Sequence, residues 1–125
     1  MQALNQIQHL PLTGEIFGRA LEHFIAQEIR AYLSYSRRRE ALTFWRTKHH
    51  QEVDFIIGDD VAIEVKGSKR VSDRDHAGLK VLGEEKTWKR RIVVSLDPHK
   101  MSFDSGIEHL FWQDFMEQLW QGKIA

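Results

Sequence analysis

Two acidic residues and a lysine occupy neighbouring segments of the chain in a pattern that could bind a cation. Asp54 lies within residues 52–57, and Glu64 and Lys66 lie within residues 61–66, after a Gly-Asp-Asp turn signal. If the two segments are strands of a hairpin, Glu64 and Lys66 share a face and Asp54 comes close to Glu64. Adjacent carboxylates repel each other unless a positive charge lies between them, and Mg²⁺ prefers hard oxygen ligands. The pattern is therefore compatible with a divalent metal site.

The chemistry that such a site favours is attack of water on a phosphate ester. Lys66 would project toward the two carboxylates, where its ammonium group could position the attacking water, help to deprotonate it, or stabilise charge on the phosphate. The same spacing also fits a surface hairpin with an ordinary Glu–Lys pair, worth about 0–1 kcal/mol. Spacing alone leaves both interpretations open.

The elements that must position these residues follow from hydrophobic periodicity and turn signals. In order, we predict helix 13–34, strands 41–46, 52–57 and 61–66, helix 75–86, strands 91–96 and 107–111, and helix 112–121. Thr13 is the predicted N-cap of the first helix, and two glycines weaken the second helix. A three-stranded meander followed by a helical crossover implies a mixed sheet with helices packed on it.

Alternation along the segment 52–57 makes a specific prediction about its two faces. Glu52 and Asp54 should share one face, and Val53, Phe55 and Ile57 should share the other. Nearby, Arg46 would lie across the hairpin from the acidic residues and is a candidate phosphate ligand. The adjacent pair at 49–50, both histidines, is more typical of an exposed loop than of a metal site.

Length and composition bound the class of protein. The 125 residues fit one domain, 1–125. Residues 1–12 show no strong hydrophobic periodicity and are interpreted as a candidate remnant of an upstream region. The absence of cysteine, of a signal peptide and of a long apolar stretch predicts a cytoplasmic protein outside the membrane. Eighteen basic and 18 acidic residues give zero net charge, which argues against binding nucleic acid by bulk charge. Local basic runs occur at 37–39 and 86–91.

The pattern of Asp54, a nine-residue gap and then Glu64-Val65-Lys66 resembles the signature of the PD-(D/E)XK nuclease superfamily. The order of predicted elements is similar to that superfamily's core. The resemblance implies a restriction-endonuclease-like three-layer α/β fold with a mixed central sheet flanked by helices. It also implies that Asp54, Glu64 and the backbone carbonyl of Val65 bind Mg²⁺ or Mn²⁺, and that Lys66 is catalytic.

The superfamily often adds a glutamate from the first helix. Resolvase-like members carry Gly-x-x-x-Glu there, which Gly18 and Glu22 match, so Glu22 is implied as a fourth catalytic and metal-supporting residue. Glu28 is a rival for this role, because it lies near the middle of the apolar stripe, where a carboxylate is unusual unless it is paired or functional. The sequence leaves the choice between them open.

A closer resemblance covers nearly the whole chain from Leu12 onward. The segments that carry it are Gly18-x-x-x-Glu22, Phe44-Trp45-Arg46, Glu52-Val53-Asp54-Phe55, Ile63-Glu64-Val65-Lys66, Leu79 and Phe115-x-x-x-Leu119-Trp120-x-Gly122. Together they resemble the C-terminal domain of unknown function of predicted prokaryotic AAA-type ATPases. This chain has no Gly-x-x-x-x-Gly-Lys-Ser/Thr loop of its own, so an ATPase region in cis or in trans is an implied partner.

These observations predict a metal-dependent nuclease-like domain that hydrolyses phosphodiester bonds of DNA. The alternative is a non-catalytic module that binds DNA or a protein and is associated with an AAA-type ATPase. The intact Asp, Glu and Lys favour the enzyme, whereas the neutral net charge favours the module. Nucleases of this fold often form dimers, and the apolar last helix is a candidate homodimer interface.

Overall fold

The computed structural model describes residues 15–37, 39–46, 52–67, 69–71, 73–99, 101–102 and 106–125. The chain forms, in order, helix α2 (Glu15–Tyr35), strands β1 (Leu42–Arg46), β2 (Glu52–Ile57) and β3 (Val61–Lys66), the 3₁₀ turn η1 (Asp73–His76), helix α3 (Ala77–Gly83), strands β4 (Arg90–Ser95), β5 (Met101–Ser102) and β6 (Ile107–Phe111), and helix α4 (Trp112–Trp120). Thr13, the predicted N-cap, and the pair at 49–50 lie outside the described residues.

The strands form one mixed sheet in the order β1-β2-β3-β4-β6-β5. The first three strands are an antiparallel meander, and β3 pairs in parallel with β4, which pairs in parallel with β6. Parallel neighbours need a crossover, and η1 and α3 supply it between β3 and β4. The predicted mixed sheet is confirmed, and the two-residue β5 at its edge was not predicted.

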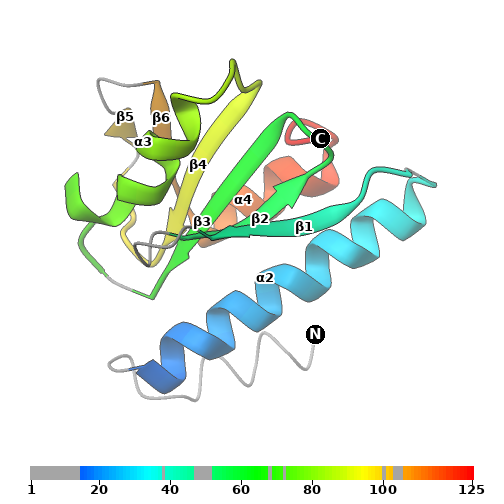
Figure 1. The fold of residues 1–125 in the computed structure, drawn as a ribbon. Helices are drawn as coiled ribbons and strands as arrows, with labels where there is room; N and C mark the ends of the chain where they lie inside the picture. Colours follow the sequence, from blue (N-terminus) through cyan, green and yellow to red (C-terminus); the bar gives the residue numbers. More distant parts are fainter. Residues whose placement is uncertain are drawn as a thin grey trace.

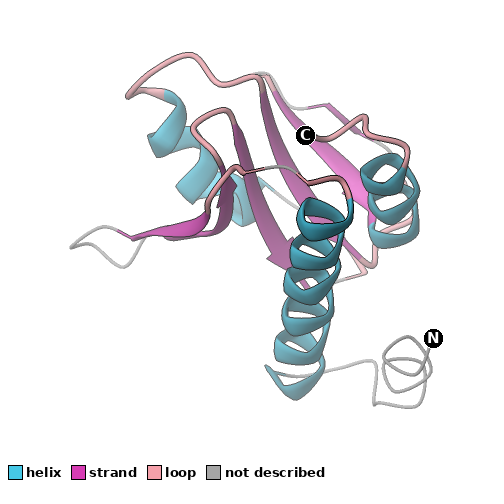
Figure 2. Ribbon diagram, turned by 90° about the vertical axis from the view of Figure 1, so that its right-hand side faces the viewer, coloured by secondary structure: helices cyan, strands magenta, loops and turns pink. Residues whose placement is uncertain are grey.

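Helices cover both faces of the sheet, which gives three layers (Figures 1 and 2). Helices α2 and α4 pack on one face over a core that includes Phe17, Leu21, Phe115 and Ile63. Helix α3 packs on the other face over a smaller cluster that includes Leu79. The predicted three-layer α/β fold is therefore confirmed.

The second helix is shorter than the predicted span 75–86. It begins as the turn η1 and is α-helical only over Ala77–Gly83. Gly78 packs against β2 so closely that an added Cβ would lie 2.3 Å from the carbonyl oxygen of Glu52. Beyond Gly83 the chain turns, and the Trp88 indole donates to the carbonyl of Leu82. The glycines here serve close packing and not helix propensity, which is why the helix is short.

The basic run at 86–91 is only partly exposed, because Lys86 and Lys89 are exposed whereas Arg90 and Arg91 are half-buried. Arg90 makes a two-pronged ion pair with Glu108, with 2.6 Å between Nε and Oε1 and 2.7 Å between Nη2 and Oε2. Arg91 donates to the carbonyl of Leu79 at 3.0 Å. Arg90 therefore bonds within the sheet and Arg91 bonds to α3, so both guanidinium groups have partners within the fold.

Candidate functional site

Strands β2 and β3 stop pairing at the point where the acidic residues lie. Their register runs from Ile57 opposite Val61 to Phe55 opposite Ile63. One step further, the backbone N–H of Val65 donates to Oδ2 of Asp54 at 2.7 Å. A side-chain carboxylate thus satisfies a strand N–H where the ladder ends, and it is held beside Glu64.

A β-bulge in β2 aims Asp54. Thr43 of β1 pairs with Ile56, but Trp45 pairs with Val53. The two residues Asp54 and Phe55 therefore lie opposite the single β1 residue that separates Thr43 from Trp45. The bulge breaks the alternation: Val53 belongs to the core beneath α3, whereas Phe55 belongs to the core beneath α2. The prediction that Val53, Phe55 and Ile57 share one face is therefore wrong for Val53.

Glu64 is the buried member of the site, with only 5% of its surface exposed. Burial, a side-chain hydrogen bond with Asp54 and the charge of Asp54 together raise its pKa to about 10. Lys66 opposes this shift, and its Nζ lies 3.9 Å from Oε1 of Glu64. Asp54, Glu64 and Lys66 therefore converge as the sequence predicted, and at neutral pH the carboxylate pair retains a proton unless a cation replaces it.

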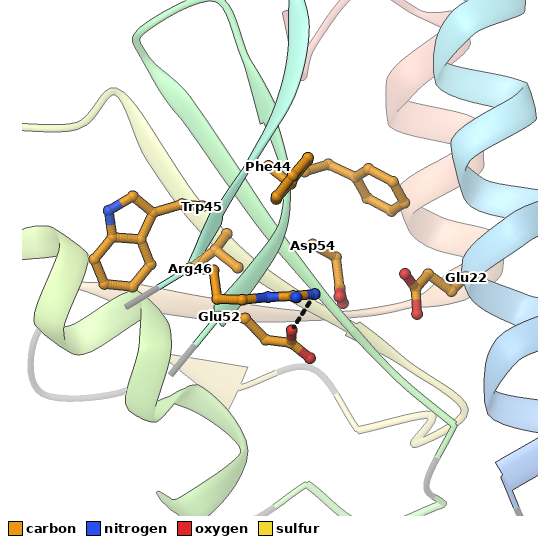
Figure 3. Close-up of a pocket in the computed structure, with 8 residues that line it drawn as sticks. Glu22, Phe44, Trp45, Arg46, Glu52 and Asp54 are labelled. Carbon is orange, nitrogen blue, oxygen red and sulfur yellow. Dashed lines mark ion pairs between the residues drawn. The ribbon is translucent and has the colours of Figure 1, made fainter. Parts of the chain in front are cut away.

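Glu22 approaches this pair from α2. Figure 3 shows its carboxylate directed from the helix toward Asp54. Burial raises the pKa of Glu22, the charges of Asp54 and Glu52 raise it further, and Arg19 and Lys66 lower it. The structure thus brings the predicted helix glutamate to the site.

Close backbone packing explains how α2 comes so near. Gly67 directly follows Lys66, and a Cβ added to Gly67 would lie 2.8 Å from the Cα of Gly18. The first turns of α2 therefore rest on the end of β3, and Glu22 lies one turn beyond this contact. Gly18 of the Gly-x-x-x-Glu pattern thus acts as a surface against which the chain after Lys66 packs.

Glu28, the rival candidate, is not part of this arrangement. It lies on α2 six residues after Glu22, which rotates it well away from the face that carries Glu22. Its Oε1 is buried and has no hydrogen-bond partner among the described residues. Within the part of the chain that the structure describes, Glu22 is the helix glutamate at the site.

The edge strand β1 completes a cavity of about 320 Å³ in front of Asp54 (Figure 3). Its walls come from α2, β1 and β2, with Glu22, Phe44, Arg46, Glu52 and Asp54 among the lining residues. Arg46 pairs with Glu52 at 3.2 Å, as its predicted position across the hairpin allows. Glu64 and Lys66 do not line this cavity, because they lie behind Asp54 on β3.

A buried polar network lies at the same end of the sheet and was missed by the sequence analysis. Ser95 lies beside Lys66 in the parallel pair β3–β4. Its hydroxyl is 2.7 Å from Nε2 of His109, whose Nδ1 is 2.6 Å from the carbonyl of His99. Burial lowers the pKa of His109. The sequence feature that could have indicated this network is the presence of Ser95 and His109 within strands that are otherwise largely apolar.

The residues fit a hard divalent cation in the type of donor they offer. Asp54 and Glu64 present adjacent carboxylates that repel each other without a proton or a cation. Among the described residues, no group of three His, Cys, Asp or Glu side chains is close enough to share an ion. A site here would rest on two carboxylates, supplemented by backbone oxygen and water, which suits Mg²⁺.

Comparisons with known proteins add the family. No curated protein and no solved structure matches the chain. Separately, no helix within the described residues is long and apolar enough to span a membrane. One family model matches residues 17–115, from the first helix to the last, and its description is "Domain of unknown function (DUF4143)". That description names neither a nuclease nor an ATPase. Because the match covers most of the chain, including every residue of the candidate site, the protein belongs to the DUF4143 family.

Proposed function

We propose that this domain is a metal-dependent nuclease that hydrolyses phosphodiester bonds of DNA. The observation that carries the proposal is the hydrogen-bonded pair of Asp54 and Glu64, with the Lys66 ammonium 3.9 Å from Glu64. Two carboxylates kept together at low exposure need either a proton or a positive charge between them. A bound cation would take the place of the proton that the raised pKa of Glu64 retains.

Asp54 and Glu64 would hold Mg²⁺ or Mn²⁺, together with the carbonyl of Val65 that the superfamily resemblance implies. When bound, the cation would polarise the phosphate and lower the pKa of water. Asp54 is already fixed through Oδ2 by the Val65 N–H, and its hydrogen bond with Glu64 would give way to the cation. Preorganised ligands of this kind lose little freedom when a substrate binds.

Lys66 and Glu22 would have different roles beside this pair. The Lys66 side chain is 38% exposed, so its ammonium can donate both to Glu64 and to a phosphate oxygen from solvent. There it would stabilise the negative charge that grows during attack. Glu22, whose pKa is raised by burial, would accept a proton from the attacking water.

The resemblance to PD-(D/E)XK nucleases and to the C-terminal domain of AAA-type ATPases supports the same proposal at the level of family. It adds an ATPase region, in cis or in trans, as a proposed partner in the cytoplasm. A homodimer is proposed on the same basis. Since fold alone does not establish function, the proposal depends on the site.

The experiment that tests it is cleavage of supercoiled plasmid and branched DNA with Mg²⁺ or Mn²⁺. Wild type should cut, and Asp54→Asn and Glu64→Gln should lose at least about a hundredfold in rate, the scale of removing a preorganised charged group. Asp59→Asn is the matched control, because Asp59 is exposed in the turn between β2 and β3 and does not line the cavity. If wild type cuts nothing and calorimetry detects no Mn²⁺ binding, the non-catalytic module becomes the better proposal.

A further inference from the structure

The cavity in front of Asp54 continues along α2 as a groove. A second cavity of about 290 Å³ shares Glu22 and Phe55 with the first. Its helix wall carries Arg19, His23 and Arg30, all exposed. Residues spaced by four and seven lie on one face of a helix, so these basic side chains form one stripe. The stripe leads toward the carboxylate site.

Phe44 lies at the other end of the groove and is 72% exposed. It projects from the edge strand β1 opposite the bulge that aims Asp54, and it lines the first cavity together with Arg46 and Glu52 (Figure 3). The Arg46 guanidinium carbon lies 5.9 Å from the ring centroid, so a cation already accompanies the aromatic face. An edge strand is usually protected by charge, and here a large exposed ring beside an acidic site offers a flat apolar face to a ligand.

The groove therefore combines an exposed aromatic ring and Asp54 in the first cavity with basic side chains in the second, and Glu22 lines both cavities. Phosphates are attracted to arginines, and the flat faces of bases stack on aromatic rings. A base inside a duplex has both faces covered by its neighbours. Only an unpaired base can present an open face to Phe44.

We propose that this groove binds single-stranded DNA, with one base stacked on Phe44 and the backbone following Arg19 and Arg30. The inference rests on the proposed function and deepens it, because it names an unpaired strand as the substrate. Stacking does not read base identity, so binding should tolerate any sequence. The neutral net charge of the chain fits this mode, which needs a local stripe and not a basic surface.

Binding is measured in EDTA, where the proposed cleavage cannot proceed. The probe is a single strand of about 12 nucleotides with a central 2-aminopurine, whose fluorescence falls when it stacks, and the comparison is the same strand in a duplex. Wild type should quench and bind the single strand at least tenfold more tightly than the duplex. Phe44→Ala should weaken binding roughly tenfold and abolish the quenching, and Phe44→Trp should retain both.

Two further variants complete the test. The double variant Arg19→Gln, Arg30→Gln should weaken binding and reduce its dependence on salt. Tyr35→Ala is the matched control, because Tyr35 is 80% exposed but lies at the far end of α2. Circular dichroism melts show that each variant is folded.

Several outcomes overturn the inference. They are equal binding of single strand and duplex, no binding of either, wild-type affinity in Phe44→Ala, or an equal loss in Tyr35→Ala. Quenching without any Mg²⁺-dependent cleavage would contradict the proposed function and leave this inference standing. Cleavage that prefers duplex DNA and is unchanged in Phe44→Ala would contradict this inference and leave the proposed function standing.

Discussion

The carboxylate of Asp54 accepts the backbone N–H of Val65, with 2.7 Å between Oδ2 and N. Val65 stands between Glu64 and Lys66 on β3, so this one bond fixes Asp54 relative to both of them. It also replaces a ladder bond at the point where β2 and β3 separate. The same carboxylate therefore has a structural role beside its proposed chemical one, and suitable substitutions should separate the two.

Asp54→Ala and Asp54→Asn should differ in stability but not in activity. Alanine leaves the Val65 N–H without its acceptor, which should cost about 1–3 kcal/mol in the free energy of unfolding. Asparagine keeps an acceptor oxygen and removes the repulsion with Glu64, so it should unfold near wild type. Both should lose Mn²⁺ binding and cleavage. Urea unfolding and calorimetry measure the two properties separately.

Equal stability of these two variants would mean that the bond to Val65 contributes little. Asp59→Ala is the control for loss of a carboxylate elsewhere, since Asp59 lies exposed in the β2–β3 turn. It should change neither the free energy of unfolding nor Mn²⁺ binding. A large effect there would point to a general consequence of altering net charge.

Much of the architecture followed from the sequence, because it depends on local patterns. Turn signals and alternation located the meander, and in β3 the predicted alternation is confirmed by Ile63 and Val65, which join the core beneath α2. The convergence of Asp54 with Glu64 needed only two adjacent strands. These are features in which neighbours along the chain determine the result.

The remainder depended on contacts between distant segments. The bulge at Asp54 exists because Thr43 and Trp45 set different registers against β2, which a period of two cannot reveal. Likewise, Glu22 and Glu28 lie on the same helix, and only the packing of Gly18 on Gly67 shows which one reaches the site. The exposed Phe44 reads as an ordinary strand residue until its edge position is known.

Divalent cation binding should release a proton. Burial and the neighbouring Asp54 raise the pKa of Glu64 to about 10, so the pair retains a proton at pH 7. An ion must displace it, and affinity should therefore increase with pH between about 6 and 9, by at most tenfold per unit. Mn²⁺ titrations at pH 7 in two buffers with different heats of ionisation measure the number of protons released, which should approach one. Glu64→Gln should bind weakly and release none, whereas pH-independent affinity in wild type would contradict the assignment.

Gly67 and Gly18 should respond oppositely to alanine, although they contact each other. A Cβ on Gly67 would lie 2.8 Å from the Cα of Gly18, in backbone that cannot easily move. Gly67→Ala should therefore push α2 away from Lys66, lower the melting temperature and reduce activity. A Cβ on Gly18 meets nothing within 4 Å, and alanine is the better helix former by about 1 kcal/mol. Gly18→Ala should be neutral or stabilising, and destabilisation of similar size in both would refute this account of the contact.

Asp97 should make stability depend on pH below about 4. Its carboxylate accepts the N–H of His99 and the N–H of Val71, each at 3.0 Å, and joins the segments that follow β4 and β3. These bonds, that of His99 first, lower the pKa of Asp97 from 3.8 to about 2. A lowered pKa means that the folded state binds fewer protons than the unfolded state, so the contribution of Asp97 to stability is complete above about pH 4 and is lost as the pH falls through 2.

Urea unfolding between pH 2 and 6 should show wild type more stable than Asp97→Asn at pH 6, with the difference shrinking toward pH 2. A difference that stays constant across this range would show that the loss in Asp97→Asn comes from packing and not from the carboxylate charge.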